Sequence, residues 1–219
     1  MIQLIINADD FGHSLCFNKM ILELIQDGAI TSTSVMVDRI TPEQDEQLKQ
    51  LMILSEEHPV SIGLHIEFKI TDFTAEIDRQ FNKFVDIFGL NPAHIDIHKD
   101  TYLKDGYKVV QKFCQEKMIP CKNLSSYGDD VMIDDITQLI TTKNSTFGAT
   151  QKSFEEIEKW LASLQDDIYV INFHPGYYDS NTKSTLNKDR EIDAENVRKI
   201  IPLLKKHNIQ LANFFDLRQ

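Results

Sequence analysis

Two adjacent carboxylates, Asp9 and Asp10, follow an apolar run at the start of the chain and precede Gly12. Neighbouring carboxylates are costly to bury unless a cation, hydrogen bonds or a proton stabilise them. They therefore indicate a functional site, or else an ordinary polar turn, because Asp-Asp before a glycine is also common in loops. The residues further along the chain decide between these two interpretations.

Three histidines supply further chemistry, each near the end of an apolar stretch: His65, His98 and His174. A single histidine in a strand is more often a hydrogen-bonded structural residue, so the functional hypothesis rests on their convergence. One carboxylate and two imidazoles from three strand ends are a recurrent ligand set for a catalytic divalent metal. A spare carboxylate and His174 would then be a base and an acid, which completes the set needed for metal-assisted hydrolysis.

The other histidines favour structural roles. Strand alternation places His94, Asp96 and His98 on one face, but His94 begins its stretch and should lie at the opposite end of a barrel from His98. We expect His13 to make a polar contact at a helix start. His58 and His207 are expected in a loop and on the surface.

Elements that could position these residues alternate along the chain. Strands are predicted at 2–6, 31–37, 60–68, 93–97, 119–124, 168–173 and 209–217, and helices at 15–27, 42–57, 75–88, 106–117, 153–164 and 193–207. The stretch 125–150 is predicted to be loop-rich around a weak helical piece at 133–140. Such alternation predicts a parallel sheet, and about seven units in one domain over 1–219 predict an α/β fold, a distorted or incomplete (β/α) barrel. Its catalytic face would be at the carboxyl ends of the strands.

Composition narrows the class of protein. The net charge of −11 and the lack of a basic cluster argue against nucleic acid or an anionic membrane as partner. The 3 cysteines lack CxxC spacing and fit reduced thiols. There is no GxGxxG or P-loop motif, and no leader or membrane-spanning stretch, so we expect a cytoplasmic protein.

Five short motifs carry a family resemblance: NADDFG at 7–12, GAITSTS at 28–34, GLH at 63–65, PAHIDIH at 92–98 and HPG at 174–176. In this order they resemble the YdjC-like carbohydrate deacetylases, a family that includes chitooligosaccharide deacetylase. The resemblance covers most of the chain, from residue 2 to about 180, and its first two motifs are quite specific.

The resemblance implies a reaction and a role for each candidate residue. The family removes an N-acetyl group from an acetylated amino sugar or oligosaccharide, using a divalent ion usually described as Mg²⁺ and sometimes Zn²⁺. Asp10, His65 and His98 correspond to its metal ligands. Asp9 corresponds to its general base and His174 to its general acid.

Departures from the family pattern leave alternatives open. Glu67 replaces the usual asparagine, and Lys99-Asp100 replaces a histidine run. The stretch 125–150 matches poorly, so the sugar subsites cannot be transferred. A barrel metallohydrolase acting on phosphoesters would use similar ligands, and a non-catalytic sugar or metal binder would also explain the departures. No interface signature fixes the oligomeric state, which leaves a homodimer open.

The pair at the start of the chain makes one geometric demand. Neighbouring residues of a strand face opposite sides. Asp9 and Asp10 can serve one site only if the chain is already leaving the strand there, with Gly12 easing the turn.

Overall fold

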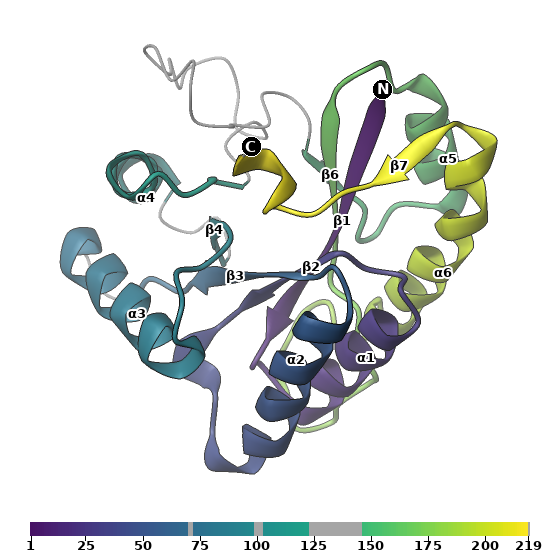
Figure 1. The fold of residues 1–219 in the computed structure, drawn as a ribbon. Helices are drawn as coiled ribbons and strands as arrows, with labels where there is room; N and C mark the ends of the chain where they lie inside the picture. Colours follow the sequence, from purple (N-terminus) through teal and green to yellow (C-terminus); the bar gives the residue numbers. More distant parts are fainter. Residues whose placement is uncertain (70–71, 99–102, 123–145, 219) are drawn as a thin grey trace.

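Seven parallel strands form one sheet in the computed structural model, which describes residues 1–69, 72–98, 103–122 and 146–218. The strand order is β4-β3-β2-β1-β6-β5, and β7 pairs with β1 (Figure 1). Over the described residues no pairing joins β4 to β5. The sheet is therefore an open half-barrel, and the predicted incomplete (β/α) barrel is confirmed.

The strands are β1 (Ile2–Phe11), β2 (Ser32–Val35), β3 (Ser61–Ile66), β4 (Ile95–Ile97), β5 (Thr146–Gly148), β6 (Ile168–Phe173) and β7 (Ile209–Leu211). The α-helices are α1 (Leu15–Gln26), α2 (Asp45–Glu57), α3 (Phe73–Phe88), α4 (Leu103–Lys117), α5 (Phe154–Ser163) and α6 (Arg190–Lys206). Short 3₁₀ turns are η1 (Val37–Arg39), η2 (Pro42–Gln44) and η4 (Asp216–Arg218).

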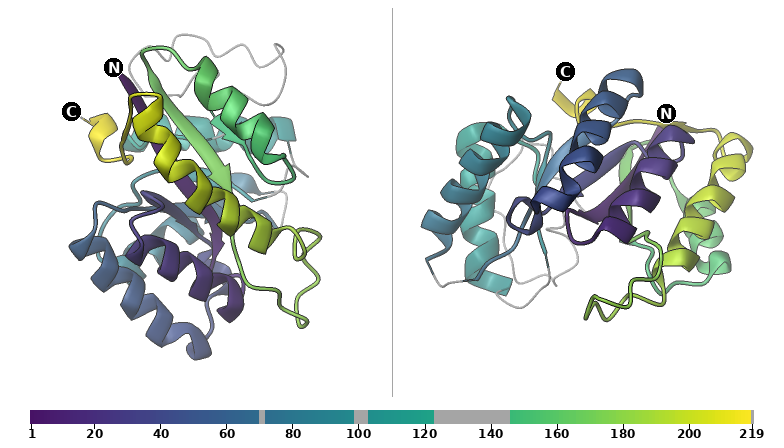
Figure 2. Two further views of the ribbon diagram at one scale, coloured as in Figure 1. Left: turned by 90° about the vertical axis from the view of Figure 1, so that its right-hand side faces the viewer. Right: turned by 90° about the horizontal axis from the view of Figure 1, so that it is seen from below.

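The helices surround the sheet on its outer side, as the two further views show (Figure 2). They pack in neighbouring pairs: α1 with α2, α3 with α4, and α5 with α6. None of the helices in the described part of the chain combines the length and the apolar character that a membrane span requires.

Strand β1 is the centre of the sheet. One of its edges pairs with β6, and its other edge pairs first with β7 and then with β2. Every residue from Leu4 to Phe11 is buried. The strand runs on past the apolar run at 2–6 to Phe11, so the carboxylate pair, expected where the strand ends, lies inside it.

Alternation along β1 separates the two faces of the sheet. Leu4, Ile6 and Ala8 pack in the large core beneath the helices. Ile5 belongs to a second apolar cluster, which includes Phe214 from the segment after β7. This cluster fills the amino end of the half-barrel and leaves its carboxyl end to polar side chains.

Predicted helix boundaries agree with the capping contacts. The Ser14 hydroxyl accepts the Phe17 N–H at the start of α1, and Ser153 with Glu156 forms the predicted capping box of α5. Gly89 ends α3 in the left-handed conformation, with φ 69°.

Two strand predictions were wrong. In place of a strand at 119–124, Cys121 makes an isolated parallel bridge to Ile95, while 123–124 lie outside the described residues. Strand β5 lies instead within the stretch predicted to be loop. The predicted helical piece at 133–140 falls outside the described residues.

Gly63 of β3 lies against the ring of His94, and replacing it with alanine should destabilise the fold. A Cβ at this position would lie 2.2 Å from a ring carbon of His94. That ring has little room to move, because it stacks on Phe214 with centroids 3.9 Å apart and its Nε2 lies 2.9 Å from the Ser34 hydroxyl. We expect a loss of ~1–3 kcal/mol in the free energy of unfolding, as for overpacked cores, measured by urea denaturation.

Gly148→Ala is the matched control, because a Cβ at Gly148, also in a strand, would meet nothing within 4 Å. We expect a much smaller loss of stability there, because the added methyl group has room. Equal losses in the two variants would contradict this explanation.

Candidate active site

Asp9 and Asp10 reach the same site through an irregularity in β1. Between Ala8 and Phe11 the register with β2 shifts, so that three steps along β1 match two steps along β2. Asp10 adopts the left-handed conformation within this bulge, with φ 72°. Aspartate tolerates that conformation better than most residues. A bulge within the strand therefore brings both carboxylates to one site, whereas we expected the chain to be leaving the strand at this point.

Asp10, His65 and His98 present three donor atoms to one point. The Asp10 Oδ1 atom lies 3.4 Å from His65 Nε2 and 3.0 Å from His98 Nδ1, and the two ring nitrogens are 3.1 Å apart. Donors bonded at ~2.1 Å to one ion are ~3.0 Å apart in an octahedron and ~3.4 Å apart in a tetrahedron. These three residues can therefore hold one divalent ion.

The charge states of the three groups depend on one another. Burial alone would raise the pKa of Asp10, but hydrogen bonds with His65 and His98 hold it well below its ordinary value. Burial would lower the pKa of His65, but the charges of Asp96 and Asp9 raise it to about 10. Burial lowers the pKa of His98. Without a metal the cluster therefore carries a proton on His65.

Asp9 sits in a network of buried donors. Its Oδ1 accepts hydrogen bonds from Lys122 Nζ at 2.5 Å and from the Asn7 amide at 2.7 Å. Its Oδ2 accepts one from the Asn172 amide at 2.6 Å. Burial works against the charged form, but the Lys122 ammonium lowers the pKa of Asp9 below its ordinary value. Asp9 is therefore a carboxylate at neutral pH.

Lys122 is a site residue that the sequence analysis missed. Its side chain is fully buried, and its ammonium pairs with both Asp9 and Asp96. Asp9, His65 and Asp96 form a second group of potential metal ligands, and the ammonium bonds to both of its carboxylates. The protein thus supplies its own cation there.

His174 extends the site from the end of β6. Its Nε2 lies 3.7 Å from Asp9 Oδ2, and its Nδ1 lies 2.8 Å from the Thr150 hydroxyl. That hydroxyl also lies 2.5 Å from the Asp193 carboxylate, which accepts the backbone N–H of His174 as well. Burial raises the pKa of Asp193, although these two hydrogen bonds favour its charged form.

Arg190 ties the two halves of the site together. Its guanidinium donates to Asp10 Oδ2 at 2.5 Å and to the backbone carbonyl of His174 at 3.2 Å. The same group lies over the ring of Phe17, 3.7 Å from its centroid. Asp10 Oδ1 is thereby left to face the histidines.

Glu67, the departure from the family pattern just after β3, forms an ion pair with Arg39. Both of its carboxylate oxygens accept hydrogen bonds from the Arg39 guanidinium. The second departure, Lys99-Asp100, lies outside the described residues.

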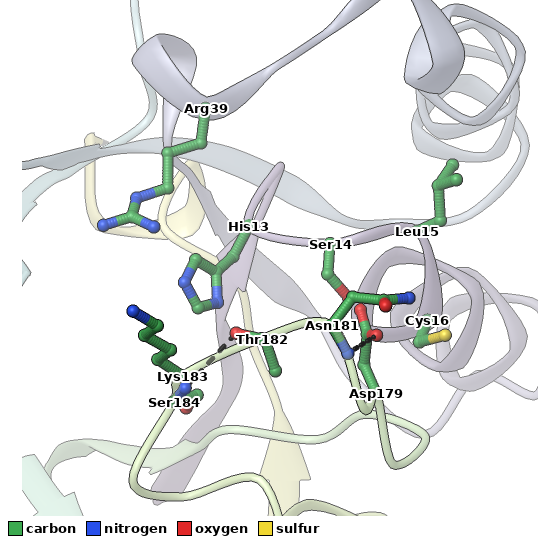
Figure 3. Close-up of a pocket in the computed structure, with 10 residues that line it drawn as sticks. All are labelled: His13, Ser14, Leu15, Cys16, Arg39, Asp179, Asn181, Thr182, Lys183 and Ser184. Atoms are coloured by element: carbon green, nitrogen blue, oxygen red, sulfur yellow. Dashed lines mark hydrogen bonds between the residues drawn. The ribbon is translucent and has the colours of Figure 1, made fainter.

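A pocket of about 680 Å³ adjoins the site (Figure 3). It contains none of the five candidate residues, but His13, in its wall, lies with its ring 6.2 Å from that of His98. The lining residues are His13, Ser14, Leu15, Cys16, Arg39, Asp179, Asn181, Thr182, Lys183 and Ser184.

The structure brings all five candidate residues together and keeps His94 apart, packed on Phe214. A signal was present for two of the missed residues: Asp96 alternates with His98, and Asn172 alternates with His174. Lys122 and Arg190 gave no such signal, because Lys122 is a single lysine within the strand predicted at 119–124 and Arg190 lies between the elements predicted at 168–173 and 193–207.

Comparison with known proteins gives one family. The pattern of the YdjC-like protein family matches residues 3–70 and 67–200. A carbohydrate deacetylase of Clostridium beijerinckii is 26% identical over 98% of this chain and all of that protein. A chitooligosaccharide deacetylase of Enterobacter sp. is 23% identical over 98% of each.

Solved structures share the fold. A protein from Enterococcus faecalis described as a cellobiose-phosphate cleavage protein has a TM-score of 0.80 at 21% identity, over 99% of this chain and 98% of its own. A family 4 acetyl xylan esterase from Clostridium thermocellum, in complex with a cobalt ion, has a TM-score of 0.58 at 10% identity, over 98% and 89%.

Removing the buried cation should cost stability. Lys122→Met leaves Asp9 and Asp96 buried without their ammonium, so we expect the free energy of unfolding at pH 7 to fall by ~3–5 kcal/mol, as when one member of a buried ion pair is removed. The loss should shrink as the pH falls, because protonation of the carboxylates removes the unpaired charge. Urea denaturation at two pH values measures both effects.

Lys199→Met is the matched control, because Lys199 pairs with Glu195 on the exposed face of α6 and water screens that pair. A loss at Lys122 as small as at Lys199 would refute the ion-pair argument.

Proposed function

The chain belongs to the YdjC-like protein family, and from this premise we propose that it is a metal-dependent hydrolase removing the N-acetyl group from an acetylated amino sugar or oligosaccharide. The observation that carries the proposal is the convergence of Asp10, His65 and His98 with Asp9 and His174 at the carboxyl ends of the strands. The deacetylase relatives, which match nearly the whole chain, support the same reaction.

We assign the metal to Asp10 Oδ1, His65 Nε2 and His98 Nδ1. A divalent ion held there would supply a Lewis acid for the acetyl carbonyl and would make a bound water more acidic. Because Arg190 engages the second oxygen of Asp10, that carboxylate is arranged to offer a single donor.

Asp9 is proposed as the general base. It is ionised, buried and held in place by Lys122, Asn7 and Asn172. It also lies near the cluster, since its carboxylate is within 4.8 Å of a His65 ring nitrogen. It is therefore positioned to accept the proton that water loses on attacking the carbonyl.

His174 is proposed as the general acid. Its Nε2 faces Asp9 across the mouth of the site, and its ring is about one-fifth exposed, so that substrate can reach it. When the amide C–N bond breaks, His174 donates a proton to the departing nitrogen, and the products are acetate and an amine. His174 on one side of the site and Asp9 on the other match the two proton transfers that hydrolysis needs.

The ligand set also bears on the identity of the metal. The family resemblance points to Mg²⁺ or Zn²⁺, whereas two imidazoles and one carboxylate suit Zn²⁺ or Co²⁺ better than Mg²⁺, which prefers oxygen ligands. We therefore propose a transition metal at this site. The cytoplasmic location and a homodimer remain predictions.

The phosphoester alternative is less well supported. Sites of that kind often use two metal ions held by neighbouring ligands. Here the second ligand group, Asp9, His65 and Asp96, is paired with the ammonium of Lys122. A non-catalytic binder would not require both a base and an acid, and this chain places a carboxylate, Asp9, and an imidazole, His174, where they can take those two roles.

Acetate release tests the proposal directly. Zinc-loaded protein incubated with N,N'-diacetylchitobiose and N-acetylglucosamine should release acetate, while Asp9→Asn and His174→Ala should each lower kcat by ~10²–10⁴-fold. Phosphate release from sugar phosphates serves as the comparison. If the wild-type protein holds its metal but releases no acetate from any acetylated amino sugar, the proposal is wrong. Phosphate release would favour the phosphoester hydrolase.

Metal binding should depend on pH through His65. The pKa of this histidine is raised to about 10 in the metal-free protein, and a metal requires its neutral form. Binding should therefore release a proton at any pH below about 10, and affinity should rise ~10-fold per pH unit between pH 6 and 8. Isothermal titration of Zn²⁺ and Mg²⁺ in buffers of different ionisation enthalpy measures both quantities. Affinity that stays flat over this range would contradict a His65 that must lose a proton in order to bind the metal.

A further inference from the structure

We propose that Thr150 and Asp193 are positioning residues that fix which nitrogen of His174 carries the proton and where its ring points. The inference rests on the proposed function, in which His174 is the general acid. Neither residue lies on β6, the strand that ends just before His174, and the family motifs quoted for this chain include neither of them.

His174 is held at three points. Its backbone N–H donates to Asp193 Oδ2 at 2.8 Å, and its backbone carbonyl accepts from Arg190 at 3.2 Å. Arg190 and Asp193 are three residues apart on α6 and so lie on the same face of that helix. The third point is ring Nδ1, which lies 2.8 Å from the hydroxyl of Thr150, just after β5. The ring is therefore anchored by a helix and a neighbouring strand end.

The directions of the hydrogen bonds follow from the groups present. The Thr150 hydroxyl has one proton, and its oxygen lies 2.5 Å from Asp193 Oδ2. While Asp193 is ionised it can only accept, so the hydroxyl donates to it. The Thr150 oxygen must then accept from His174, which requires a proton on Nδ1. The neutral ring is therefore the Nδ1–H tautomer.

This arrangement frees Nε2 for chemistry. Nε2 faces Asp9 of β1 at 3.7 Å, which is the side on which the reaction is proposed. The charged groups around His174 are Asp9 and Asp10 of β1, together with Arg190 and Asp193 of α6, which bond to its backbone. A proton taken up at Nε2 is the one that can pass to the departing nitrogen, and Nδ1 stays engaged throughout.

Long-range ¹H–¹⁵N correlation spectra of zinc-loaded, ¹⁵N-labelled protein report the tautomer without requiring activity. The wild-type His174 signals, assigned by their loss in His174→Ala, should show the Nδ1–H form when the ring is neutral. Thr150→Val keeps the shape of the side chain but removes the acceptor, and it should abolish the preference for that form. Thr150→Ser should keep the preference, and Thr74→Val, at an exposed threonine of α3, should leave it unchanged.

Kinetics separate a positioning role from a structural one. Thr150→Val should lower kcat by ~10-fold or more with KM within about twofold, and Thr150→Ser should restore most of the loss. Should Thr150→Val not fold, Thr150→Ala provides the test, because it removes the same hydroxyl with a smaller side chain. Asp193→Ala removes the acceptor that both the Thr150 hydroxyl and the His174 N–H use, and in either variant the neutral ring should lose its preference for the Nδ1–H form.

Each outcome decides something different. An Nε2–H tautomer in the wild type, or a Thr150→Val variant with unchanged tautomer and kcat, would overturn the inference while leaving the deacetylase proposal intact. Wild-type protein without deacetylase activity would defeat the proposed function, and the spectra would still determine whether Thr150 fixes the tautomer.

Discussion

The buried ammonium of Lys122 between Asp9 and Asp96 is the interaction on which the site depends. Three carboxylates, including Asp10, gather at the carboxyl end of the half-barrel, and such a cluster is expensive to bury without positive charge. Lys122 neutralises two of them, and Arg190 bonds to the third. In the metal-free protein the proton on His65 adds a further positive charge to offset the carboxylates, and a divalent ion would replace that proton.

The bulge in β1 is what places Asp9 and Asp10 in the same site. In a regular strand Asp9 and Asp10 would point to opposite faces, one into the half-barrel and one beneath the helices. With Asp10 in the left-handed conformation, one carboxylate joins the histidines and the other joins Lys122. Two adjacent residues thereby acquire different charge partners and different proposed roles, ligand and base.

The sequence predicted the half-barrel and the five candidate residues because each element has strong local signals: alternating strands and helices, capping residues, and polar side chains at strand ends. It did not predict Lys122, Arg190, Thr150 or Asp193, whose contacts with the five candidate residues join segments far apart in the sequence. Lys122, for example, is 113 residues from Asp9. Strand β5 was missed because three residues carry too little periodicity to be recognised, and its pairing with β6 is what defines it.

We infer that one metal ion and one lysine share the polar end of the half-barrel. The most direct test is a crystal structure of zinc-soaked protein with anomalous data collected at the zinc edge. We expect a single peak ~2.0–2.2 Å from the donor atoms of Asp10, His65 and His98, with Lys122 still between Asp9 and Asp96. A second peak between those two carboxylates with the lysine displaced, or no peak at the three donors, would contradict it.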